Sequence, residues 1–257
     1  MTNPDDLIEV LALRHEVLRS LLDEPKERHE LVDDLEGAKS TVYKGVSQLQ
    51  DLGLVAQTSR GLRPTLFGTA ALERYDEMAR TAALGDLLAD LPPGTIEPAA
   101  IVGAVAVVPD RRSVDRHLAR LRRVLEDAES IRLFSPAVSP EQTSIVHDRS
   151  VDGRLAAELV LPEELVRHLY RIDPTGLEET VAAEDVEFYR TDRQLPISLL
   201  LASSASGTEV CVGLGEEGVA TGLVVNDTAE SRRWAEAEFE RIRRSAERVT
   251  VDALRSA

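Results

Sequence analysis

Residues 38–55 read Ala38-Lys39-Ser40-Thr41-Val42-Tyr43-Lys44-Gly45-Val46-Ser47-Gln48-Leu49-Gln50-Asp51-Leu52-Gly53-Leu54-Val55. The apolar side chains Val42, Val46, Leu49 and Leu52 recur at helical spacing, which predicts a helix with one stripe facing a core. Before Asp51 the other face carries hydrogen-bonding side chains and cations, with no carboxylate: Lys39, Ser40, Tyr43, Lys44, Ser47 and Gln48. Such a face suits phosphate oxygens and base edges, so this helix is a candidate for contact with nucleic acid.

The segments on either side of this helix predict a small helical domain that ends in a β-hairpin. Residues 26–35 fit a short preceding helix, and Gly53 ends the central helix as a C-terminal stop. Residues 54–57 and 62–64 fit two short strands joined by the tight turn Ser59-Arg60-Gly61. Two helices followed by a two-stranded ribbon with arginine at its tip predict a winged helix-turn-helix.

The stretch also resembles the recognition helix and wing entry of archaeal and bacterial winged-helix transcription regulators. The resemblance is carried by Lys39-Ser40-Thr41-Val42-Tyr43-Lys44, by Asp51-Leu52-Gly53-Leu54-Val55, and by Thr65-Leu66-Phe67-Gly68, which opens the next helix in those families. It implies that the partner is double-stranded DNA. The candidate DNA-contacting residues are Lys39, Ser40, Thr41, Tyr43, Lys44, Ser47, Gln48, Arg60 and Arg63. The alternative is a protein-interaction module whose winged helix does not touch DNA.

The overall charge argues against a general nucleic-acid binder. The 257 residues include 46 acidic and 30 basic side chains, a formal net charge of −16, whereas phosphate contacts need positive charge. The charge is unevenly distributed, because residues 37–64 hold four cations against the single carboxylate of Asp51, a local charge of +3. The positive patch is small and coincides with the predicted interface.

The balance of cations predicts an unusual cellular setting. All lysines lie near the N-terminus, at Lys26, Lys39 and Lys44, and every later cation is arginine. An acid-rich, lysine-poor and aromatic-poor chain resembles the proteins of salt-accumulating halophilic archaea, in which negative charge keeps a protein solvated when salt screens repulsion. An acidic protein from a GC-rich genome is the alternative.

The chain divides by pattern into three parts: a DNA-binding domain at 1–65, a linker or dimerisation helix at 66–92, and an effector and dimerisation domain at 93–257. The helical pattern of 66–91 fits a helix packed on its own domain, and it also fits a helix that forms a contact in a homodimer. We expect the homodimer contact. Leu91-Pro92-Pro93-Gly94 marks the boundary. The fold class expected overall is α/β, with a helical N-terminal domain carrying a β-wing and a C-terminal α/β domain.

The C-terminal part alternates apolar strand-like runs with helical runs, which favours a layered α/β domain with one central sheet. The predicted strands are 102–108, 131–135, 155–161, 186–189, 197–202, 209–214 and 220–225. The predicted helices are 114–128, 163–170 and 229–254.

The last third resembles the effector domain of archaeal methanogenesis-type regulators. The resemblance lies in Leu195-Pro196-Ile197-Ser198-Leu199-Leu200, Gly213-Leu214-Gly215, Gly222-Leu223-Val224-Val225-Asn226-Asp227 and the run from Ala229 to Glu236, which contains Trp234. It implies a domain that senses a ligand or dimerises, with a sheet related to the phospholipase D-like fold. A small-molecule effector is therefore an expected partner.

Catalysis is not expected. Phospholipase D chemistry needs a His nucleophile and a Lys in one short motif, and no Lys follows Lys44. His117, His147 and His168 have no metal-ligand spacing around them, and Cys211 is the only cysteine, so neither a metal nor a cofactor is predicted.

Polar residues after the predicted strands are the candidate effector site, because pockets in α/β sheets open beyond the carboxyl ends of strands. The candidates are Ser135, His147, Arg149 and Arg190, although each also fits an ordinary solvated loop. No apolar run reaches about 18 residues, and no signal-peptide pattern opens the chain. No membrane contact and a cytoplasmic location are therefore expected.

Overall fold

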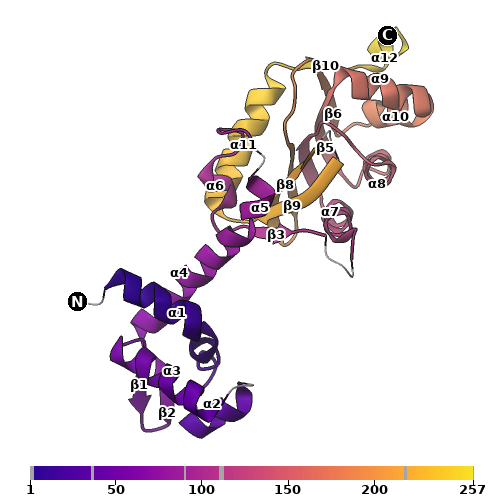
Figure 1. Cartoon of the computed structure of the whole chain (residues 1–257). Helices are drawn as coiled ribbons and strands as arrows, with labels where there is room; N and C mark the ends of the chain where they lie inside the picture. The colour runs from indigo at the N-terminus through magenta and orange to yellow at the C-terminus, as the bar shows by residue number, and fades with distance from the viewer. Residues whose placement is uncertain (1–2, 36–37, 90, 110–112, 217–218, 257) are drawn as a thin grey trace. The chain divides into compact units, whose positions relative to one another are not determined.

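The computed structural model describes residues 3–35, 38–89, 91–109, 113–216 and 219–256. The chain separates into two compact units, Met1–Ala79 and Arg80–Ala257. Helix α4 begins in the first unit and ends in the second. The α/β class is confirmed, since helices accompany an eight-stranded sheet in the second unit (Figure 1).

The first unit consists of helices followed by one hairpin. Its elements are α1 (Pro4–Arg19), α2 (Arg28–Asp34), α3 (Lys39–Asp51), β1 (Val55–Thr58), β2 (Gly61–Pro64) and α4 (Leu66–Ala83). The core lies where α1, α3 and the start of α4 meet, and includes Leu18, Leu31, Val46 and Leu49, all fully buried. The predicted helical stripe of α3 is confirmed, because Val42, Val46 and Leu49 are buried while the opposite side is exposed.

The connection from α3 to α4 depends on a very close backbone approach. Gly53 has φ +74°, a left-handed conformation that glycine adopts without strain and that ends the helix. The Thr65 backbone N–H donates to the Leu54 carbonyl at 2.9 Å, and the Thr65 hydroxyl donates to the Gly53 carbonyl at 2.7 Å. At Gly68 a Cβ atom would lie only 2.0 Å from that same Leu54 oxygen, so this turn of α4 requires glycine.

The second unit is built on one mixed sheet. Its strands are β3 (Val105–Val107), β4 (Ser130–Phe134), β5 (Ala156–Pro162), β6 (Val186–Thr191), β7 (Ser198–Ser204), β8 (Gly207–Glu216), β9 (Val219–Asn226) and β10 (Glu247–Arg248). All seven predicted strands are confirmed, with end positions shifted by a few residues. The order is β10-β6-β5-β4-β7-β8-β9-β3. Strands β4, β5 and β6 are parallel, whereas every other neighbouring pair is antiparallel.

Helices cover both faces of this sheet (Figure 1). On one face α11 (Ala229–Arg243) buries Trp234, Phe239 and Ile242, together with side chains from the short helices α5 (Gly85–Leu88) and α6 (Pro98–Ile101). The other face is covered by α7 (Arg116–Asp127), α8 (Pro140–Val151), α9 (Glu163–Ile172), α10 (Pro174–Ala182) and α12 (Val251–Arg255). Strand β7 shows the two-sided burial, since alternate residues enter opposite cores.

Several helix predictions are corrected. The predicted helix 66–91 ends at Ala83, with α5 as a separate turn. The predicted helix 229–254 is three elements, because β10 interrupts it by pairing with β6. Helices α8 and α10 were not predicted, although each begins with an N-cap side chain followed by proline: Ser139-Pro140 and Asp173-Pro174. Consequently His147 and Arg149 lie on α8 and not in a polar loop.

Candidate nucleic-acid interface

The exposed face of α3 is narrow and polar. Successive residues turn by about 100°, so Ser40, Lys44 and Ser47 fall within roughly 60° of one another, opposite the buried stripe. All three are exposed, as are Lys39 and Thr41, whereas Tyr43 and Gln48 are half-buried on its two flanks. Ala38 gives the helix start no side-chain cap, and the first turn contains no acidic residue. The first turn of α3 therefore places no carboxylate of its own against an anion.

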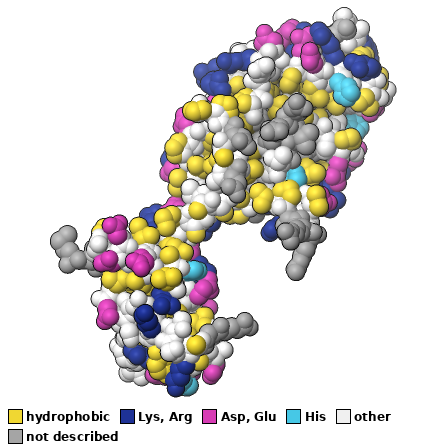
Figure 2. All heavy atoms as spheres, viewed as in Figure 1, with side chains coloured by type: hydrophobic (Ala, Val, Ile, Leu, Met, Phe, Trp, Pro, Cys, Tyr) yellow, Lys and Arg dark blue, Asp and Glu magenta, His cyan; other side chains and the backbone are white. Residues whose placement is uncertain are grey.

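The candidate cations of this surface are not neutralised. Within the described ranges Lys39, Lys44, Arg60 and Arg63 take part in no ion pair. Three other cations of the unit do: Arg19 pairs with Glu16 and Asp76, Lys26 with Asp34, and Arg74 with Glu77. The Lys26 ammonium donates a hydrogen bond to the Asp34 carboxylate, and this bond raises the pKa of Lys26 above its usual value. Among the described residues of this unit, four of the six lysines and arginines outside ion pairs therefore lie on α3 and the hairpin, while the other two, Arg14 and Arg28, donate to Gln48 and Gln50. Lys and Arg share the drawn face of this unit with Asp and Glu (Figure 2).

Two cations lie close to the Tyr43 ring. The Lys39 ammonium lies 5.4 Å from the centre of its ring, and the Arg28 guanidinium, which comes from α2, lies 5.8 Å from it. Arg28 also donates to the Gln50 side chain at 2.7 Å. Both contacts fit cation–π geometry and restrain the ring at the edge of the exposed face. Arg28 was not predicted as part of this surface, because its contact with Tyr43 depends on how α2 packs against α3.

Gln48 already has a partner within the fold. Its side-chain oxygen accepts a 2.9 Å hydrogen bond from Arg14 Nε, which crosses from α1. Arg14 passes close to Gly45, where a Cβ would come within 3.0 Å of Arg14 Cδ. A bidentate contact with adenine needs both the oxygen and the nitrogen of the amide. In this structure Gln48 therefore acts as a bridge between α1 and α3, with only its amide nitrogen left to donate outward.

The β-hairpin presents arginine at a well-supported tip. Thr58 pairs with Gly61, leaving Ser59 and Arg60 as a two-residue turn. The Thr58 hydroxyl accepts from the Arg60 backbone N–H at 3.2 Å and donates to the Gly61 carbonyl at 2.7 Å. Arg60 and Arg63 are both exposed.

The hairpin is tied to the segment before α2. Lys26 and Leu62 exchange two backbone hydrogen bonds, of 2.8 and 3.2 Å. Gly61 has φ +119°, and a Cβ there would lie 2.8 Å from the Lys26 carbonyl carbon. The hairpin is therefore held to the helical part of the unit by backbone contacts that a side chain at position 61 would disrupt.

The four candidate effector residues of the second unit do not converge on one pocket. Ser135 is buried after β4, with its hydroxyl 2.7 Å from that of Ser198. Arg149 donates to the Ala128 carbonyl before β4 begins, so the two sites are separated by the strand length, about 20 Å. The His147 side chain is hydrogen-bonded through Nδ1 to the Thr180 hydroxyl at 3.0 Å.

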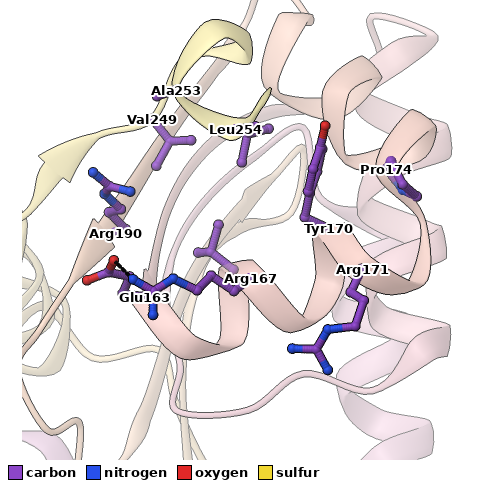
Figure 3. A pocket seen from close by; sticks show the side chains of 10 residues that line it. Glu163, Arg167, Tyr170, Arg171, Pro174, Arg190, Val249, Ala253 and Leu254 are labelled. Atoms are coloured by element: carbon purple, nitrogen blue, oxygen red, sulfur yellow. Dashed lines mark hydrogen bonds and ion pairs between the residues drawn. The ribbon is translucent and has the colours of Figure 1, made fainter. Parts of the chain in front are cut away.

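Arg190 lines a real cavity, which we call the arginine-rimmed cavity. It encloses about 380 Å³ between α9, β6 and the α12 segment (Figure 3). Its lining includes Val166, Arg167, Tyr170, Arg190, Val249 and Leu254. A second cavity of about 580 Å³, the tryptophan-lined cavity, has a lining that includes Phe134, Arg193, Leu195, Trp234, Glu238 and Arg241. Of the four candidates, only Arg190 is part of either cavity.

Two further features bear on chemistry. Burial raises the pKa of the Cys211 thiol from 9.0 to about 12, so this side chain is a core residue with little thiolate character. Among the described residues no group of His, Cys, Asp and Glu side chains has an arrangement suited to a metal ion. In the same residues no helix is both long and apolar enough to cross a bilayer.

Comparison with known families gives two sequence matches. The model described as methanogenesis regulatory protein FilR1, middle domain, matches residues 114–245. A second model, described as the HVO_A0261 N-terminal domain, matches residues 5–86. The first match covers most of the sheet and its helices, and the second covers the helices and hairpin that carry the candidate interface. No curated protein matches the chain.

Solved structures show more distant similarity. TrmBL2, described as an archaeal chromatin protein with a novel mode of DNA binding, is 16% identical; the match covers 96% of this chain and 100% of that chain, with TM-score 0.44. Nuc, a phospholipase D family member from Salmonella typhimurium, is 8% identical over 57% of this chain and 97% of that chain, with TM-score 0.43. Polyphosphate kinase from Porphyromonas gingivalis is 10% identical over 76% of this chain and 32% of that chain, with TM-score 0.38. These identities and TM-scores are low, so the family assignment rests on the sequence models.

Proposed function

This chain belongs to the family of the FilR1 middle domain, and we propose that it is a sequence-specific DNA-binding transcription regulator. In this proposal the first unit is a winged helix-turn-helix, with α3 as the recognition helix and the β1–β2 hairpin as the wing. The second unit is a non-catalytic, phospholipase D-like sensing domain. The family description names a regulatory protein, which supports the assignment to transcription control.

The exposed face of α3 supports major-groove binding. The major groove of B-DNA admits one α-helix, and the N-terminal residues of a recognition helix contact base edges. We assign base contacts to Ser40, Lys44 and Ser47, which share the centre of the face, with Tyr43 at its border. Lys39 and Thr41, on its flanks, are assigned to phosphates. Gln48 is assigned a positioning role through Arg14, with its amide nitrogen as a possible single donor.

The wing is assigned to the DNA backbone and the adjacent minor groove. Arg60 at the two-residue turn projects from the end of the hairpin, and Arg63 lies on β2. A rigid hairpin presents a guanidinium at low entropic cost, because the backbone geometry is fixed before binding. Narrow minor grooves carry enhanced negative potential that attracts arginine.

The observation that carries the proposal is the charge state of this surface. The chain has 46 acidic residues, yet Lys39, Lys44, Arg60 and Arg63 form no ion pair among the residues that the structure describes. Surface cations near carboxylates pair with them, as Arg19 and Arg74 do. Cations kept apart from carboxylates remain available to bind DNA phosphates. Each phosphate that a cation neutralises releases counterions from the DNA, which favours binding.

The proposal includes three further elements. The regulator acts as a homodimer, because two recognition helices reading half-sites one DNA turn apart, roughly 34 Å, give affinity that one helix lacks. Its DNA affinity responds to a small molecule bound by the second unit. Its setting is the cytoplasm of a salt-accumulating archaeon, in keeping with the acid-rich, lysine-poor composition.

The test is to recover and sequence the DNA that the tagged full chain retains from its native cells. Fluorescence anisotropy then compares the recovered sequence with a scrambled duplex of the same composition. The proposal requires enrichment of one sequence and at least about 4 kcal/mol of preference for it over the scrambled duplex. If no sequence is enriched and both duplexes bind equally weakly, the protein-interaction alternative replaces it.

A further inference from the structure

The arginine-rimmed cavity lies near the carboxyl ends of two neighbouring parallel strands. Helix α9 begins at Glu163, immediately after β5, and Arg190 stands near the end of β6. The C-terminal segment closes the opposite side through Val249 and Leu254. In α/β proteins ligands bind beyond the carboxyl ends of strands, and about 380 Å³ lies within the range of small-molecule sites.

The interior of the cavity is apolar. Val166, Val249 and Leu254 line the cavity, and each is exposed by only a few per cent. Val166 lies on α9, whereas Val249 and Leu254 lie in the C-terminal segment. Figure 3 shows Val249 and Leu254 on the side of the cavity that faces α9, with the Tyr170 ring forming a further wall. The Tyr170 hydroxyl points away to Glu178, to which it donates at 3.0 Å, so the ring presents its apolar face. This part of the cavity suits an alkyl chain or an aromatic ring.

Three arginines, Arg167, Arg171 and Arg190, line the cavity with one carboxylate, Glu163. Arg167 and Arg190 lie on the same side, close to Glu163 (Figure 3). Arg167 contacts Glu163 at 2.5 Å across one helical turn, and Arg190 contacts Glu247 at 2.8 Å across the β6–β10 pair. Side chains of both carboxylates are at least 37% exposed. Exposed ion pairs of this kind contribute little, so a ligand anion can replace either carboxylate without a large energetic cost.

We propose that this cavity binds a small monocarboxylic acid with an apolar chain or ring. The carboxylate lies between the guanidinium groups of Arg167 and Arg190, and the apolar part contacts Val166, Val249 and Leu254. Guanidinium groups match the planar carboxylate with paired N–H donors. The inference names the ligand class for the sensing domain, and it rests on the proposed function only in treating that ligand as an effector.

Binding at this place acts on the end of the chain. Segment 249–255 forms one side of the cavity. It is tied to the rest of the unit by the Val249 backbone N–H, which donates to the Phe188 carbonyl at 2.7 Å, and by the Arg255–Glu178 ion pair. A ligand that contacts Val249 and Leu254 holds this segment against α9. Amide hydrogen exchange of residues 251–255 therefore slows when the cavity is filled.

The test uses octanoate, with 1-octanol as the uncharged control, titrated calorimetrically into the full chain in molar KCl. Octanoate binds at least tenfold more tightly than octanol, because the charge-assisted hydrogen bonds need the carboxylate. Arg167→Gln and Arg190→Gln each weaken octanoate binding by about tenfold and leave octanol binding unchanged. Arg233→Gln is the matched control, because Arg233 is an exposed, ion-paired arginine on α11 outside the cavity.

Two further readouts separate the outcomes. Trp234, the only tryptophan, lines the other cavity, so its fluorescence stays constant while octanoate binds. Thermal melts confirm that the variants are folded. The proposal is overturned if octanoate binds no better than octanol, if both cavity variants bind like the parent, or if binding changes Trp234 fluorescence. The DNA-binding assay of the ligand-free protein is independent, so failure here leaves the proposed function standing.

Discussion

Gly68→Ala should strongly destabilise the first unit, for a reason visible in the backbone. A Cβ at position 68 would lie 2.0 Å from the Leu54 carbonyl oxygen and 2.9 Å from its carbon. An ordinary carbon–oxygen contact is about 3.3 Å, so α4 and the α3–β1 connection must separate by more than ~1 Å. That movement strains the core, at about 1–3 kcal/mol. It also weakens the hydrogen bond from Thr65 to Leu54, at about 1 kcal/mol. The expected loss is roughly 2–4 kcal/mol.

Urea unfolding of the full chain measures this loss with two signals. Far-UV circular dichroism follows both units, whereas fluorescence follows the second unit, which contains the only tryptophan, Trp234. The part of the dichroism transition that reports the first unit should move to lower urea, while the fluorescence midpoint stays in place. Gly85→Ala is the matched control, because a Cβ there meets no atom within 4 Å, and it should change stability by less than about 1 kcal/mol. A Gly68→Ala protein within about 0.5 kcal/mol of the parent would refute the reasoning.

Three other properties can be measured directly. Cys211 should resist a thiol reagent at pH 8 until the protein unfolds, because burial raises its pKa to about 12. The unfolded chain releases the thiol proton near pH 9, whereas the folded chain holds it up to about pH 12. The free energy of unfolding, compared with that of Cys211→Ala, should therefore fall by about 1.4 kcal/mol per pH unit between pH 9 and 12. Identical pH profiles of the two proteins would contradict this. The thermal midpoint should rise from dilute to molar KCl, as screening relieves repulsion in a chain of charge −16, and a flat or falling midpoint counts against a halophilic setting. Light scattering in molar KCl should give twice the monomer mass of 28.2 kDa, and a monomer across micromolar concentrations excludes the homodimer.

Burial periodicity explains why much of the fold could be predicted. Val42, Val46 and Leu49 share one side of α3 because a single stripe meets the core. The strands of the second unit are buried on both faces, so they read as continuous apolar runs such as residues 199–202. The helix α8 lacks a strong apolar stripe, and its readable signal was the capping box of Ser139 and Gln142. No proline or glycine marks the place where helix α11 ends before β10, because the chain leaves the helix there to pair with β6.

The exposed residues of the candidate interface could be predicted from the sequence, but the residues that hold them in place from other helices could not. The spacing of Ser40, Lys44 and Ser47 places them on one face of any helix formed by these residues. The partners of Gln48 and Tyr43 come from α1 and α2, through contacts of Arg14 and Arg28 that span 34 and 15 residues of sequence. Contacts of that kind depend on helix packing angles, which local spacing does not encode. The effector candidates failed to converge for the same reason, since strand order decides which loops meet.

The most direct test of DNA binding by the α3 face and the hairpin is the salt dependence of affinity for the recovered DNA. Each phosphate contact contributes about −0.9 to the slope of log affinity against log salt. Anisotropy across a KCl series should show slopes that are smaller in magnitude by about 0.9 for Lys39→Gln and for Arg60→Gln. Arg74→Gln, which removes an exposed cation paired with Glu77 on α4, should leave the slope unchanged. Parent-like slopes for both Lys39→Gln and Arg60→Gln, or an equal change for Arg74→Gln, would contradict the account.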